Sequence, residues 1–203
     1  VRGRAHGCHS SPIRPQLRLR LRMCEAEMHA YRLFELLPAA TIACLVAACE
    51  TAPREPSLGE IKGIAEKYRD VNLAKAAGYT TDNKCVTAEM LGHPAELGAM
   101  GLHYVRRDML GLPPKPPRPG SGRVSGSGTH TDFREPAMLV YEPQPDGSLK
   151  LVAVENLVFA AAWHAKSKAP PTFHGRAYQL LKDDPATKVD EAHGWQPHYE
   201  QHL

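Results

Sequence analysis

The sequence lacks the short motifs that identify the commonest enzyme classes. It contains no Gly-rich phosphate loop, no nucleophile elbow and no dinucleotide-binding fingerprint. Its eleven histidines include no H-E-x-x-H pair, and its five cysteines include no C-x-x-C pair. The motif content therefore gives no support to nucleotide chemistry or to a serine hydrolase, and a metal site would have to be assembled from residues far apart in the chain.

The chain also lacks a basic excess beyond its first 48 residues. Those 48 residues hold seven Arg and no Lys against three Glu, whereas the remainder holds 18 Lys and Arg against 19 Asp and Glu. The formal net charge of +3 thus belongs to the leading segment. Because nucleic-acid binding requires a basic patch on the folded part, we predict that nucleic acid is not a partner.

The apolar run in the leading segment is too short to cross a membrane. Residues 36–48 fall short of the ~20 apolar residues that a spanning helix needs, and Pro38 interrupts them. The run follows Arg32 and ends in small residues before Cys49, which is the order of elements in a secretory signal. Its end resembles a bacterial lipobox, in which the Cys is lipid-modified and becomes the new N-terminus.

We therefore predict that residues 28–48 are a lipoprotein signal peptide and that a lipid on Cys49 anchors the protein to the periplasmic side of a bacterial envelope membrane. Plain secretion is the second interpretation, and a buried core helix is the third. Residues 1–27 are rich in Arg and are predicted to be a non-native upstream extension, with an organellar transit peptide as the alternative. Residues 49–56 are predicted to be a short polar tether.

Residues 57–203 are predicted to form a single α+β domain. A helix is expected to begin at Ser57, because Ser57 and Glu60 have the spacing of a capping box, and to end at Gly78. Apolar residues follow at helical spacing and mark one buried face: Leu58, Ile61, Ile64, Ala65, Tyr68, Val71 and Ala74.

Extended segments occupy the rest of the expected core. Two apolar runs on either side of Asp146-Gly147 predict a β-hairpin over residues 137–159. Residues 100–105 and 198–203 are predicted to be further strands. The predicted fold is an N-terminal helix packed on a small, mainly antiparallel β-sheet.

The remaining segments are less regular. Residues 79–98 and 183–195 are expected to be loops, and residues 160–168 a short helix that ends before two prolines. Residues 173–182 fit either a helical turn or a strand. Residues 112–130 are rich in Pro, Gly and Ser, a composition that cannot bury a core, so we expect a flexible surface insertion.

Several of these segments resemble those of an uncharacterised family of exported bacterial proteins, which has a G-x-H-Y-V strand, an A-L-L-Y-E-P strand and a V-x-V-E strand. The matching segments here are residues 101–105 (GLHYV), 135–143 (EPAMLVYEP), 151–155 (LVAVE), 170–175 (PPTFHG) and 199–202 (YEQH). The resemblance spans roughly residues 68–203. It implies an exported protein of this outline and no particular chemistry.

This chain departs from the family pattern in two ways. Family members have a shorter stretch in place of residues 112–130. They also continue past the histidine strand to a final Cys, whereas this chain stops at Leu203, as a short member or one that lacks a final segment. The resemblance thus implies that the disulfide partner of Cys85 lies beyond Leu203. A catalytic role for Cys85 would need a nearby His base, and a structural role is the interpretation we favour.

Histidines and one glutamate are the candidate site residues. If the last strand is extended, its period of two places His198, Glu200 and His202 on one face. His103 and Glu155 lie on other strands of the same expected sheet. Convergence of His103, Glu155, His198 and His202 would suit Zn²⁺ or another divalent transition metal.

Glu155 is the most suggestive single residue, because it interrupts an apolar strand. A buried carboxylate is costly unless it is paired or metal-bound. If it were unpaired, its pKa would rise and would suit a general acid or base. For this residue we rank a structural pair with His103 that fixes the strand register first, ligand binding second and catalysis third; a place at the solvent-exposed edge of the sheet is a further alternative.

We predict a non-catalytic envelope lipoprotein that binds a small ligand or metal in a pocket lined by His103, Tyr104, Glu155 and His202. A metal-dependent hydrolase or lyase with Glu155 as its base is the first alternative. A structural envelope protein, whose polar pair only specifies the fold, is the second.

Overall fold

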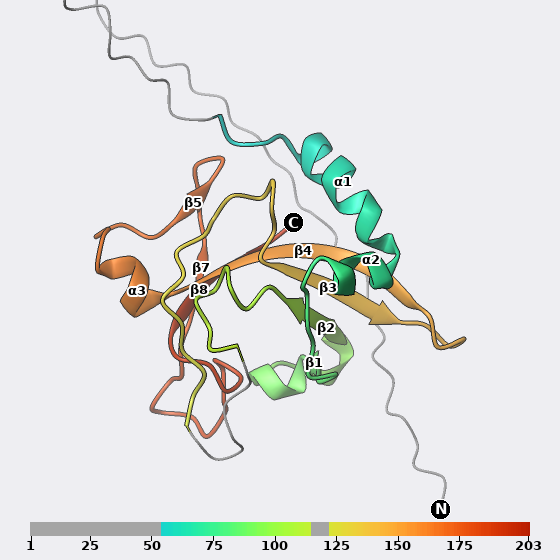
Figure 1. Ribbon diagram of the computed structural model, residues 1–203. Helices are drawn as coiled ribbons and strands as arrows, with labels where there is room; N and C mark the ends of the chain where they lie inside the picture. The colour runs from blue at the N-terminus through green and yellow to red at the C-terminus, as the bar shows by residue number, and fades with distance from the viewer. Residues whose placement is uncertain (1–53, 115–121) are drawn as a thin grey trace, which may run out of the picture. The chain divides into compact units, whose positions relative to one another are not determined.

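A sheet of six antiparallel strands is the main element of the fold (Figure 1). The computed structural model describes residues 54–114 and 122–203. The order across the sheet is β1-β2-β3-β4-β8-β7. These strands are β1 (Cys85–Thr87), β2 (Ala99–Val105), β3 (Met138–Pro143), β4 (Leu149–Phe159), β8 (His198–His202) and β7 (Gln179–Leu181). The predicted α+β fold with a mainly antiparallel sheet agrees with this structure in outline, in which the described residues form a mainly antiparallel sheet with few helices.

The predicted hairpin is the centre of this sheet. β3 and β4 pair from Met138 opposite Glu155 to Pro143 opposite Leu149. In the turn, Gly147 has a φ of 84°. Such a positive φ is available to Gly without steric cost, which explains the strong turn signal of Asp-Gly. β4 is 11 residues long. Its first part pairs with β3 along one edge, and its last part, from Glu155 to Phe159, pairs with β8 along the other edge.

The N-terminal helical segment is broken where the sequence predicts one continuous helix. It consists of α1 (Leu58–Glu66), the 3₁₀ helix η2 (Lys67–Arg69) and α2 (Val71–Ala76). The predicted capping box is present: the Ser57 hydroxyl accepts from the Glu60 amide, and the Glu60 carboxylate accepts from the Ser57 amide. The break occurs at Asp70, whose backbone is extended and whose carboxylate caps α2 by accepting from the Asn72 amide.

The two faces of the sheet carry different side chains, because successive strand residues point to opposite faces. One face holds the larger apolar cluster, which includes Leu139, Tyr141, Val154 and Val158 of the sheet together with Ile61, Tyr68 and Ala74 of the helical segment. The Tyr141 hydroxyl donates to the Tyr68 carbonyl at 2.6 Å. The opposite face holds a smaller apolar cluster, formed by Leu110, Leu112, Ala137, Met138, Leu157 and Phe159.

Residues 122–130, from the predicted Pro/Gly/Ser-rich insertion, pack closely against the domain at two glycines. A Cβ added to Gly126 would lie 2.1 Å from the Leu110 carbonyl oxygen, and one added to Gly128 would lie 2.1 Å from that of Met109. Val124 forms a parallel bridge with Trp195. The glycines therefore serve close backbone approach, which composition alone could not distinguish from flexibility.

Shorter elements complete the described chain. The expected loop at 79–98 contains β1 and the 3₁₀ helices η3 (Glu89–Leu91) and η4 (Ala95–Leu97). The expected helix after the hairpin is shorter than predicted, as α3 (Ala160–His164), and the segment that fitted either helix or strand forms β5 (Thr172–Phe173), β6 (Arg176–Ala177) and β7.

Cys85 is disulfide-bonded. Its partner lies outside the described residues, because Cys85 is the one cysteine within residues 54–114 and 122–203.

The predicted extension, signal peptide, lipidation at Cys49 and most of the tether lie outside the described residues. Within residues 54–114 and 122–203, no helix combines the length and hydrophobicity that a membrane crossing requires.

Candidate functional site

Four histidines and two glutamates gather on the sheet face that holds the smaller apolar cluster: His103, Glu155, His193, His198, Glu200 and His202. β2 supplies the first histidine, β4 supplies Glu155, and β8 supplies three residues at alternate positions. His193 comes from the loop before β8. The residues form two groups of three, and within each group one ligand atom per residue lies within 4.8 Å of the others.

The strand register places Glu155 at the centre of the first group. Glu155 lies directly opposite His202 in the β4–β8 ladder, while His103 reaches it across β3. The Glu155 Oε2 atom is 3.2 Å from Nε2 of His202 and 3.4 Å from Nε2 of His103. Glu155 is only 1% exposed, so it does not lie at a solvent-exposed edge.

The second group lies further along β8. The Nε2 atom of His198 is 3.5 Å from Oε2 of Glu200. The ring of His193 lies 5.4 Å from the ring of His198, centroid to centroid. Glu200 also connects the two groups, because its Oε1 atom lies 3.8 Å from Nδ1 of His202.

In the first group, the neighbouring charges shift the pKa values of Glu155 and His202 in opposite directions. Burial by itself would raise the pKa of Glu155, but the neighbouring His202, with smaller contributions from His103 and His198, lowers this pKa to about 2. Burial by itself would lower the pKa of His202, but Glu155 and Glu200 raise it to about 9. At neutral pH the metal-free group therefore contains a carboxylate beside an imidazolium.

His193 differs from His202 in its electrostatic surroundings. Burial lowers the pKa of His193, and the charge of His198 lowers it further, while Glu200 opposes both effects. The imidazole of His193 is therefore neutral at neutral pH, which is the form that binds a metal ion.

Several buried polar atoms of the two groups have no hydrogen-bond partner among the described residues: His103 Nδ1, Glu155 Oε2, His193 Nε2, His198 Nε2 and His202 Nε2. Buried polar atoms are nearly always paired, and each unpaired one costs roughly 1–3 kcal/mol. Glu155 Oε2 and His202 Nε2 lie 3.2 Å apart, yet no hydrogen bond of good geometry joins them. This arrangement indicates a site whose polar atoms are arranged for a further partner.

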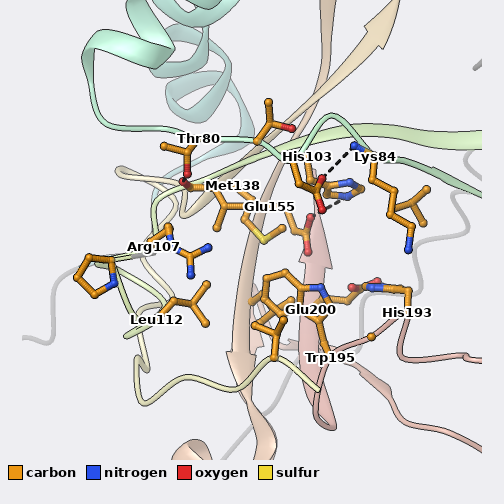
Figure 2. A pocket seen from close by; sticks show the side chains of 18 residues that line it. Thr80, Lys84, His103, Arg107, Leu112, Met138, Glu155, His193, Trp195 and Glu200 are labelled. Carbon is orange, nitrogen blue, oxygen red and sulfur yellow. Dashed lines mark hydrogen bonds and ion pairs between the residues drawn. The ribbon is translucent and has the colours of Figure 1, made fainter. Parts of the chain in front are cut away.

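A cavity of about 420 Å³ borders both groups (Figure 2). His103, Glu155, Glu200 and His193 lie along one side of it, and Arg107 and Leu112 lie on the other. Its remaining lining is largely apolar, from Val86, Val105, Pro114, Val124, Met138, Leu157 and Trp195. Lys84 adds a second cationic side chain.

The structure brings together three of the four predicted ligand-binding residues, which are His103, Glu155 and His202. Tyr104 is a correction, because it packs in the larger apolar cluster with its ring 5.0 Å from that of Tyr141. Adjacent strand residues face opposite ways, so Tyr104 cannot share a pocket with His103. His198 belongs to the second group rather than the first.

Two residues of the site are absent from the sequence-based candidates. Glu200 carries a clear signal, since the period of two already places it between His198 and His202. No sequence pattern predicts His193 as a site residue, because it lies in a loop whose path depends on tertiary structure. The other described histidines lie outside both groups: His93, His130, His164 and His174.

The first group has the donor set of a transition-metal site, and two of its three ligand–ligand separations have the spacing of such a site. Two ligand atoms at about 2.0–2.1 Å from a tetrahedral Zn²⁺ lie about 3.3–3.4 Å apart. The Glu155–His103 and Glu155–His202 separations of 3.4 and 3.2 Å match this spacing. A closed ion pair is the competing arrangement, and it would use the same atoms without needing the cavity.

Comparison with protein-family models, curated proteins and solved structures gives no match to this chain. The family resemblance therefore stays an expectation, and the function must be argued from the site itself.

Proposed function

We propose that the protein binds a divalent transition metal, with Zn²⁺ as the best-suited ion, through His103, Glu155 and His202. The observation that carries the proposal is the position of Glu155 Oε2, which faces two imidazole Nε2 atoms at ligand–ligand spacing and makes no hydrogen bond. Imidazole and carboxylate ligands of this kind suit Zn²⁺ and similar ions.

The second group supports this assignment. In metal sites the outer nitrogen of a ligating histidine commonly faces a carboxylate or carbonyl, which orients the ring. Glu200 Oε1 lies in that position relative to Nδ1 of His202, at 3.8 Å. With Glu155 as the ligand, Glu200 would be the orienting carboxylate.

The cavity indicates what else would bind. Three protein ligands leave the fourth position of a tetrahedral ion open, and the cavity borders two of these ligands, His103 and Glu155. Lys84 and Arg107 line the same cavity together with Asp82, and the rest of its lining is largely apolar. A small molecule with an anionic group and an apolar body would suit this combination.

A metal-dependent hydrolase or lyase is the second candidate, and the cavity that His103 and Glu155 line favours it. A catalytic zinc keeps an open position for water or substrate, whereas a structural zinc has four protein ligands. Glu155 would then serve as a ligand, and Glu200, which also lines the cavity, is the carboxylate available as a base. Metal-dependent turnover of ester or phosphoester substrates would favour this candidate over a binding protein.

The test is elemental analysis of the full chain purified without chelators and without a His-tag. We expect near-stoichiometric metal in the native protein and its loss in the His103→Ala/His202→Ala double variant. His93→Ala is the matched control, because His93 is exposed and lies outside both groups. A folded protein with equal metal content in the native and double-variant forms, or with none in either, would leave the structural pair as the function of these residues.

We further propose, from the sequence of residues 28–49, that the protein is exported and lipid-anchored at Cys49 on the periplasmic face of the envelope. Mass spectrometry of the N-terminal peptide would show an acylated Cys49, and Cys49→Ser would lose partition into detergent. Retention of residues 28–48 on an unmodified Cys49 in the native host would contradict this proposal.

A further inference from the structure

The second group, His193, His198 and Glu200, contains a metal-site geometry of its own. His198 is fully buried and the side chain of Glu200 is 7% exposed. Neither residue is needed to form the contacts among His103, Glu155 and His202. A buried histidine facing a buried carboxylate beside a cavity requires its own explanation.

The hydrogen bond at Nδ1 of His198 determines which ring nitrogen is available to a ligand. Nδ1 of His198 lies 2.9 Å from the Gln196 carbonyl oxygen. A carbonyl oxygen only accepts, so Nδ1 donates a proton to it, and Nε2 is the ring atom left to face Glu200. Nε2 lies 3.5 Å from Oε2 of Glu200, is buried and has no hydrogen-bond partner among the described residues, so a cation between these two atoms would give both of them a partner.

His193 supplies the third donor from the loop before β8. Its Nε2 atom is buried and has no hydrogen-bond partner among the described residues. One ligand atom of each of His193, His198 and Glu200 lies within 4.8 Å of the other two. His193 holds a φ of 37°, which is uncommon for a residue other than Gly and indicates that its surroundings impose its position.

We propose that His193, His198 and Glu200 form a second position for a divalent transition metal, next to the first, so that the cavity wall carries a two-metal centre. Glu200 connects the positions, because one of its oxygens faces His198 and the other faces His202. The second position does not depend on the first, since no donor is shared between the two sets of ligands, whereas the two-metal centre also rests on the proposed first site.

Two adjacent metal ions at the side of the cavity would favour ligands with a particular kind of polar group. Paired divalent ions bind both oxygens of a phosphate or carboxylate group, and two-metal sites of this kind stabilise the attacking and leaving oxygens of hydrolytic reactions. The first ligand class to test is therefore a small phosphorylated or carboxylated compound.

Metal stoichiometry of the full chain tests the second site. The protein is stripped with a chelator, dialysed against Zn²⁺ and analysed for bound metal, and it is also titrated with Co²⁺ to follow the visible absorption bands. We expect two ions per native chain and one ion in His193→Gln and in Glu200→Gln. His103→Gln should also retain one ion, at the other position, whereas His93→Gln should retain two.

The possible results separate this proposal from the proposed first site. One ion in the native chain that is lost in His103→Gln and kept in His193→Gln overturns the second site and leaves the first intact. One ion that is lost in His193→Gln and kept in His103→Gln supports the second site and overturns the first, and no bound metal overturns both. Glu200→Gln keeps the side-chain volume, so it decides the question if a His193 variant fails to fold.

Discussion

At the scale of single residues, Glu155 concentrates the properties of the site. Its β4 neighbours on the same face, Leu157 and Phe159, are buried apolar residues. A carboxylate among them is stable only because imidazoles from two other strands surround it. Removing this carboxylate alone would leave the His202 imidazolium buried without its partner, so Glu155 and the histidines depend on one another.

Replacing Glu155 by Gln tests its proposed role as a metal ligand. The variant keeps the side-chain volume but loses the charge and one strong ligand, so we expect Zn²⁺ affinity to fall by at least about tenfold to hundredfold. Isothermal titration calorimetry would measure the change. Glu96→Gln, at an exposed position outside both groups, should bind as the native protein does. Unchanged affinity in Glu155→Gln would place the metal elsewhere.

The metal-free protein should lose stability on both sides of a pH window set by this pair. The pKa of His202 is raised to about 9, so its contribution is complete below its unfolded value of about 6.5 and is lost as the pH rises through 9. The pKa of Glu155 is lowered to about 2, so its contribution is complete above about 4.5 and is lost as the pH falls towards 2.

Urea unfolding in the presence of a chelator would check this dependence. Between pH 6.5 and 9 we expect the free energy of unfolding to fall by an amount on the order of 1–3 kcal/mol. His202→Gln should lack this decrease, because the titrating group is gone. A native profile that stays flat across this range would contradict the assigned ion pair.

At the scale of elements, the close packing of the Gly/Ser segment is a condition for the cavity. Gly126 lies against the Leu110 carbonyl and the Phe159 ring. This contact holds the segment so that Val124 pairs with Trp195 at the cavity wall. The glycine is therefore part of the structure that shapes the pocket.

Gly126→Ala should destabilise the protein by about 2–4 kcal/mol, because its Cβ would lie 2.1 Å from a backbone oxygen. Gly63→Ala is the contrasting control. It lies within α1 with nothing within 4 Å of the added Cβ, so Ala should be neutral or stabilise by up to about 1 kcal/mol. Thermal unfolding of both variants would measure the difference. Equal effects would show that residues 122–130 do not pack as described.

At the scale of the whole molecule, the two faces of the sheet differ in what they carry. One face is covered by the helical segment and carries the larger apolar cluster. The other face combines a smaller apolar cluster with the polar groups and the cavity. Changes on the site face that preserve the Glu155–His202 pair should therefore leave the larger apolar cluster intact.

Metal binding should nevertheless raise the stability of the whole domain, because an ion that binds only the folded state shifts the unfolding equilibrium. Zn²⁺ at a hundred times its dissociation constant should add about 2.7 kcal/mol per independent site. Calorimetry of chelated and Zn²⁺-loaded protein would show the increase in Tm. The His103→Ala/His202→Ala variant should show a smaller increase, and an equal one would contradict the proposed first site.

Local patterns determined much of the outline. The Asp146-Gly147 turn, the capping box at Ser57 and the alternation in the last strand depend on neighbours within a few residues, so the sequence alone predicted the hairpin, the start of α1 and the shared face of His198 and His202. The break at Asp70 was also encoded locally, in a capping residue that the apolar periodicity obscured.

The site itself was decided by tertiary structure. Whether His103 meets Glu155 depends on the strand order β2-β3-β4, and whether His198 joins the first or the second group depends on the register of β4 with β8. The alternation of strand residues that places His103 on the site face also places Tyr104 on the opposite face. His193 belongs to the site through a loop, and a loop has no periodicity from which its position could be predicted. Contacts between distant segments come from packing and pairing of the whole sheet, which no short stretch of sequence contains.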